Sequence, residues 1–245
     1  MDSNIISFIG TFAPGAIYAF IVYVSMPKKT VELEHAPLFF SAGILAVIGV
    51  IVSHFIFPAI STMVTTNIPG MLVRNYVQVA FVEELFKFLF FMLAIRYFMP
   101  SSVRSGVFMY MSVGCGFAAA ENFAYLQRAV YELTAGMDTS SVNSMLAVRS
   151  FSATVFHMTA GILVGKLWGD GRPLLGFLIA VFMHGTYNCI IVLSESEASA
   201  YLIAGVCLVV AFIACIELLD KDFFKLIESP HKKKPGNTTP GPSSD

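Results

Sequence analysis

Seven long apolar runs constrain this chain more than any other feature of its sequence. Each run holds about 20 mostly apolar residues, the length that a helix needs to cross the hydrocarbon core of a bilayer. The runs cover residues 5–26, 37–60, 76–99, 104–127, 145–167, 173–194 and 198–219. We therefore predict an all-α fold, a polytopic transmembrane helical bundle with about seven spans.

The composition supports a membrane protein. Hydrophobic residues make up 56% of the 245 residues and charged residues only 13%, whereas soluble domains are about 45–50% apolar and about 25% charged. The charge is confined to short segments between the apolar runs, which indicates a lipid bilayer as the partner. No basic patch is present, so we expect no nucleic-acid partner. The four cysteines lie inside apolar runs without a CxxC pair, which argues against disulfides and a thiolate zinc site.

Lysine and arginine gather in alternate loops, and this bias predicts the orientation. The C-terminus is expected in the cytoplasm and the N-terminus outside, in a multi-pass protein of the cell membrane. Residues 1–228 form one predicted membrane domain, with the informative motifs between residues 76 and 194. Residues 229–245 are polar and rich in proline, serine and glycine, so we predict a disordered cytoplasmic tail.

Ionisable groups occur inside four consecutive predicted spans, the third to the sixth. Each such group costs about 2.5–3.5 kcal/mol to insert, so it is a candidate functional residue. The candidates, with two asparagines beside them, are Glu83, Glu84, Lys87, Glu121, Asn122, His157, His184 and Asn188. A rise of about 1.5 Å per residue places the three glutamates, the two histidines and Asn188 about 9–18 Å from the outer ends of their spans. This shared depth predicts one cavity that opens outward. Gln78 and Arg149 are weaker candidates.

Helical spacing predicts which groups face each other. Glu83 and Lys87 are four residues apart and share a helix face, as do His184 and Asn188. Glu83 and Glu84 are about 100° apart around their helix, so only one can point squarely into the site. The other is expected to bond sideways or to orient the first.

Small residues on the fourth span suggest how the helices meet. Gly114, Gly116 and the alanines at 118–120 predict a close helix approach. That approach would bring Glu121 near the glutamates of the third span.

These residue types suit the hydrolysis of a peptide bond. A buried carboxylate can act as general base and then as general acid, and a histidine with an asparagine can stabilise an oxyanion. Ser152 lies five residues before His157 and off its face, which disfavours a serine nucleophile. A zinc site remains open, because Glu83, Glu121, His157 and His184 are possible ligands, although HExxH is absent.

Four motifs in this order resemble a known family. They are EELFK from Glu83, FAAAEN from Phe117, the lone His157 and HGTYN from His184. Over about residues 76–194 the chain is similar to PrsW-type intramembrane proteases, relatives of the CAAX prenyl endopeptidase and bacteriocin-processing superfamily. Lys87 comes three residues after the second glutamate, whereas the prenyl-protein branch usually has arginine one position later.

The resemblance implies a membrane protease with a conical helical core and a catalytic glutamate. Glu83 would activate water with support from Glu84, and His184 and Asn188 would line the oxyanion site. Glu121 and His157 would complete the polar site, and Lys87 and Asn122 would support it.

The expected reaction is endopeptidase cleavage of a membrane-spanning protein or peptide substrate, in or near the bilayer. We expect no cofactor, with zinc as the open alternative. A zinc-dependent protease using the same residues, a non-catalytic scaffold and a proton-coupled transporter remain alternative functions. The transporter would predict inverted repeats, and none is evident in the sequence.

Overall fold

The structure is a computed structural model that describes residues 35–56, 68–100, 102–136 and 138–193. Its long helices are α2 (Ala36–Ile56), α5 (Val82–Ile95), α6 (Val103–Thr134), α7 (Thr139–Gly169) and α8 (Pro173–Leu193). A short helix α4 (Ile68–Val73) and a π-helix η2 (Arg74–Phe81) lead directly into α5. The predicted first and last spans and the predicted tail lie outside these residues.

The prediction of an all-α fold is confirmed for the described residues, which contain helices and no strands. In the part of the chain that the structure describes, two helices are long and apolar enough to cross a bilayer, α8 and the part of α2 from Ala36 to Ser53. The other predicted spans within the described residues are also helical, but they carry the charged and polar side chains. The count of seven spans stays a prediction.

Local signals in the sequence explain where the helices begin and end. Ser102 caps α6, because its hydroxyl oxygen accepts a hydrogen bond from the Ser105 backbone N–H at 3.1 Å. α7 ends before Gly171, whose positive φ of 75° is readily adopted only by glycine. Pro173 then begins α8, where its missing N–H costs nothing.

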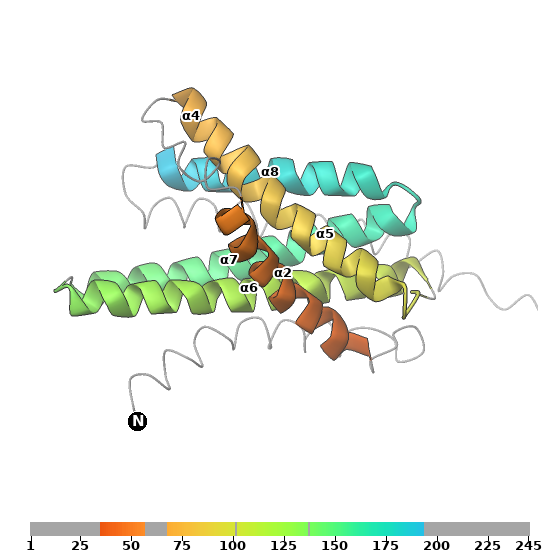
Figure 1. Cartoon of the computed structure of the whole chain (residues 1–245), viewed down its shortest axis with the longest axis horizontal. Coiled ribbons are helices and arrows are strands. Elements are labelled where there is room, and N and C mark those ends of the chain that lie inside the picture. The colour runs from red at the N-terminus through yellow and green to blue at the C-terminus, as the bar shows by residue number, and fades with distance from the viewer. Residues whose placement is uncertain (1–34, 57–67, 101, 137, 194–245) are drawn as a thin grey trace, which may run out of the picture.

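Figure 1 shows α6 and α7 as a long pair lying side by side, with α4, η2 and α5 forming one continuous rod that crosses them. α8 packs against α7 and η2, and α2 packs against α6 and α5. Because each helix of the bundle touches at least two others, polar groups from distant parts of the sequence can meet in its middle.

Gly114 permits the close contact between α6 and α7. A Cβ at this position would overlap the backbone carbonyl of His157, so only glycine lets the helices approach this closely. Gly116 makes a similar contact with the backbone of Phe40 on α2. The predicted close approach is therefore present, but it joins α6 to α7 and α2, and this packing sets where Glu121 and His157 lie.

The third predicted span differs from an ordinary helix in its first part. Residues 74–81 form a π-helix immediately before Glu83 and Glu84, and short π segments often accompany functional sites. Here the π segment packs on α8, where the ring of Tyr76 fills the space above Gly185. The hydroxyls of Tyr76 and Thr186 lie 2.8 Å apart. These contacts fix α8 against the start of α5, beside His184.

Candidate active site

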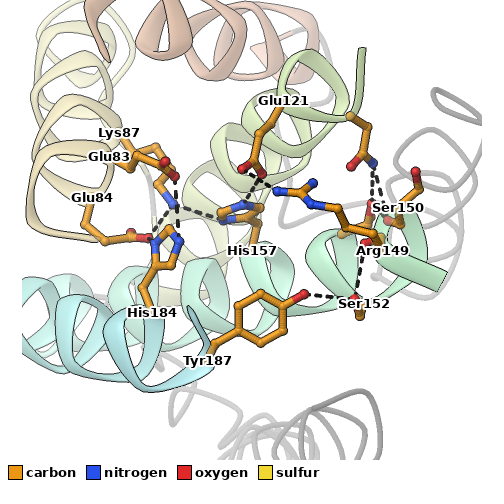
Figure 2. Close-up of polar contacts among 12 residues, drawn as sticks. Glu83, Glu84, Lys87, Glu121, Arg149, Ser150, Ser152, His157, His184 and Tyr187 are labelled. Carbon is orange, nitrogen blue, oxygen red and sulfur yellow. Dashed lines mark hydrogen bonds and ion pairs between the residues drawn. The ribbon is translucent and has the colours of Figure 1, made fainter. Parts of the chain in front are cut away.

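Side chains from α5, α6, α7 and α8 meet in one polar cluster inside the bundle (Figure 2). Its members are Glu83, Glu84 and Lys87 of α5, Glu121 of α6, Arg149 and His157 of α7, and His184 of α8. Glu84 and Lys87 are each only 1% exposed, and both histidines are buried. In an apolar interior, groups this polar persist only when they are paired.

Glu84 is the most heavily bonded carboxylate of the cluster. Its Oε1 accepts hydrogen bonds from the Lys87 ammonium, one turn later on α5, and from Nδ1 of His184 at 2.8 Å. Lys87 was predicted to share a face with Glu83, but its ion pair is formed with Glu84. Glu84 therefore neutralises Lys87 and orients His184.

Glu121 occupies the other side of the cluster. Its Oε1 accepts from the Arg149 guanidinium at 3.0 Å, and its Oε2 lies 3.1 Å from Nε2 of His157. The Arg149 guanidinium also lies over the ring of Tyr125. Glu121 is thus held from two sides by α7.

His157 connects the two halves of the cluster. Its Nδ1 lies 3.0 Å from the Lys87 ammonium, and its Nε2 faces Glu121. An ammonium has donors only, so Nδ1 must accept, and the proton of the neutral ring is on Nε2. The Lys87 ammonium also lies 4.5 Å from the ring centroid of Phe117, so Glu84, His157 and an aromatic face surround it.

Glu83 differs from the other two carboxylates. It is 8% exposed, and its Oε2 has no hydrogen-bond partner among the described residues. Its nearest ionic neighbour is Nε2 of His184, at 3.7 Å. In the neutral form of His184 with its proton on Nδ1, where Glu84 accepts it, Nε2 carries the lone pair on the side of Glu83. Of the three carboxylates Glu83 is therefore the least tightly held, with no hydrogen bond at Oε2 among the described residues and only the 3.7 Å contact with His184.

Two predicted residues lie apart from these contacts. The Asn122 amide donates to α7, to the Ser150 carbonyl and the Thr154 hydroxyl, each at 3.3 Å. It therefore joins helices instead of entering the cluster. Asn188 follows His184 by one turn and is half-buried. Within the described part of the chain its amide makes no hydrogen bond to the cluster.

Sequence reasoning gave too little weight to Arg149 and left out a set of aromatic supports. In the sequence, Arg149 is a charged residue near the outer end of an apolar run, and this position indicated only a weak candidate. The ring of Phe156 stacks on Tyr187 at 5.1 Å and lies 4.9 Å from the ring of His184. The Tyr187 hydroxyl lies 2.8 Å from that of Ser152. An aromatic residue in an apolar run carries no signal of such a role.

The family comparison agrees with this arrangement. Residues 33–216 match the family described as PrsW family intramembrane metalloprotease. The chain belongs to the PrsW family. The match covers about three quarters of the sequence and includes every helix that contributes to the cluster. The predicted family is therefore confirmed, and with it a place in the membrane.

One curated relative of the PrsW family supports this assignment. The chain is 28% identical over 135 residues to the protein named Protease PrsW from Oceanobacillus iheyensis. The alignment covers 51% of this chain and 57% of that relative, so it spans little more than half the length of either. No solved structure was found to match the chain.

The family description implies a metal, and the cluster contains donors of suitable type. Glu83, Glu121 and His157 each offer a ligand atom, and these atoms lie within 4.8 Å of one another. Catalytic zinc commonly takes three such protein ligands. His184, also predicted as a possible ligand, is not part of a three-donor group among the described residues.

The hydrogen bonds around His157 do not suit a metal. A histidine that binds a metal through one nitrogen donates the proton of its other nitrogen to an acceptor. The nitrogen available to Glu83 and Glu121 is Nε2, and the other, Nδ1, faces the Lys87 ammonium, which can only donate. The types and number of these residues suit a metal ion, but the hydrogen bonds around His157 do not. In this arrangement the group therefore does not fit a metal.

Proposed function

We propose that this PrsW-family protein is an endopeptidase that cleaves membrane-protein substrates with a water molecule activated by Glu83. The contrast among the three carboxylates supports this most strongly. Glu84 and Glu121 are occupied by ion pairs with Lys87 and Arg149. Among the described residues, Glu83 Oε2 accepts no hydrogen bond, and it lies next to His184. A general base needs this freedom to accept a proton from water.

In the proposed reaction, Glu83 removes a proton from water while the water oxygen attacks the scissile carbonyl carbon. The C–N bond then breaks, and the proton passes from Glu83 to the leaving nitrogen. Nε2 of His184, 3.7 Å from Glu83 Oε2, is positioned to hydrogen-bond the same water or the protonated glutamic acid. Glu84 keeps His184 in this orientation through its bond to Nδ1.

The developing oxyanion needs a hydrogen-bond donor. We assign this role to the Asn188 amide, on the turn of α8 that follows His184, because it is not engaged by the cluster. Glu121 and Arg149 hold α6 to α7, and with His157 they keep the site in shape. Preorganised groups of this kind accelerate a reaction because they need not rearrange as charge develops.

The proposed substrates are membrane-spanning proteins or peptides. A transmembrane helix hides its carbonyls in its own hydrogen bonds, so the segment to be cut must unwind locally before water can attack. The basic residues in alternate loops favour a cytoplasmic C-terminus, with the cluster nearer the outer face. Cleavage near the outer side of the bilayer is the expected result.

The test uses purified protein and a library of single-span substrates. Wild type, wild type with a strong zinc chelator, Glu83→Gln and His184→Ala are compared, with Glu132→Gln as a control outside the cluster. We expect cleavage that survives the chelator, disappears in both cluster variants and is unchanged in the control. Loss of cleavage on chelation would favour a metalloprotease. Full activity of a folded Glu83→Gln variant would remove Glu83 from the proposed role.

A further inference from the structure

Lys87 is placed where it decides what His157 can bind. The two nitrogens of His157 meet opposite partners, an ammonium donor at Nδ1 and a carboxylate acceptor at Nε2. Both partners require the same neutral form of the ring, with its proton on Nε2. The hydrogen bonding of His184 is the opposite of that of His157, because its Nδ1 donates to Glu84. In their neutral forms these contacts give the two histidines opposite tautomers, with ring centroids 5.4 Å apart.

From this contrast we propose that Lys87 excludes a metal ion from the group formed by Glu83, Glu121 and His157. A metal bound through Nε2 would displace the proton of that nitrogen, and the neutral ring would have to carry its proton on Nδ1. That proton would point at the hydrogens of the Lys87 ammonium. The lysine therefore acts as a positioning residue that keeps His157 a hydrogen-bond donor to Glu121.

Lys87 has little freedom to move out of the way. Its ammonium is buried, paired with Glu84 and placed over the ring of Phe117. Turning away from His157 would leave a charge buried without its partners, which is costly. The inference extends the proposed function, since a site closed to metal must activate water with its own carboxylate.

The first measurement reads the tautomers directly. Protein labelled with ¹⁵N-histidine in detergent micelles is studied by NMR through the long-range couplings of the ring nitrogens. Signals are assigned by their loss in His157→Gln and His184→Gln variants. We expect His157 with its proton on Nε2 and His184 with its proton on Nδ1. A His157 ring protonated on Nδ1 in the wild type would overturn the inference, whether or not the protein cleaves any substrate.

The second measurement compares zinc binding by wild type, Lys87→Gln and Lys87→Met. The two variants lose the same charge, but only glutamine offers an oxygen that can accept from Nδ1. Loss of such a partner typically lowers metal affinity 10–100-fold, so we expect Lys87→Gln to bind zinc about 10–100-fold more tightly than Lys87→Met. Binding in Lys87→Gln should disappear when His157 is also replaced.

Two results would refute the role of Lys87. One is stoichiometric zinc binding by the wild type that depends on His157. The other is equal zinc affinity, or no affinity, in folded Lys87→Gln and Lys87→Met. Both measurements read binding and protonation, so they remain informative if no substrate is cleaved. Failure of the proposed function would show instead as absent cleavage with the expected tautomers intact.

Discussion

The adjacent residues Glu83 and Glu84 should fail in different ways when each is changed to glutamine. The substitution keeps the shape of the side chain and removes its charge. Glu84 neutralises Lys87, and their side chains are only 1% and 2% exposed. Removing one partner of a buried ion pair costs about 3–5 kcal/mol, because the remaining charge has no compensation.

For Glu84→Gln we expect the lower end of that range, about 3 kcal/mol. The amide oxygen can still accept from Lys87 and from Nδ1 of His184, so part of the network survives. For Glu83→Gln the expected loss is less than about 1 kcal/mol, because the side chain gives up no hydrogen bond at Oε2. The substitution also removes repulsion from the neighbouring carboxylates, which offsets part of any loss.

The free energy of unfolding is measured by titrating the purified variants from mild detergent into a denaturing detergent, with helical content as the readout. Cleavage of a single-span substrate is measured on the same samples under conditions where both variants are folded. We expect Glu83→Gln to be stable and inactive, and Glu84→Gln to be destabilised. Equal destabilisation of the two variants, or an active Glu83→Gln, would refute the division of roles between them.

Three further outcomes are expected from the packing. Gly114→Ala should cost about 1–3 kcal/mol in unfolding free energy and lower activity, because the added methyl group pushes α7 away. Arg149→Met should cost about 3 kcal/mol by the same detergent titration, whereas Arg128→Met, at an ion pair whose arginine is 68% exposed, should cost less than about 0.5 kcal/mol. Ser152→Ala and Tyr187→Phe should each cost about 0.5–1.5 kcal/mol. A double-mutant cycle of the last pair should show coupling, since one hydrogen bond is lost in both.

The sequence by itself determined the class of fold and the candidates for the site. Apolar runs long enough to span a bilayer predict helices, because in lipid the backbone must form all its hydrogen bonds within the segment. Charged groups are costly there, so the few that occur, such as Glu83, Glu121 and His157, stand out against their surroundings. The order of the motifs was enough to suggest the family, and the family match confirms it.

The tertiary structure decided which of these groups are partners. Lys87 lies one turn from both glutamates, and helical spacing alone predicted a shared face with Glu83, yet the ion pair forms with Glu84. The sequence could not show this choice, because it depends on where α8 places His184 and where α7 places His157. Helix packing is set by contacts such as the one at Gly114, between residues far apart in the chain. Which histidine nitrogen donates and which accepts is known only once those packed neighbours are known, and the proposed exclusion of a metal depends on it.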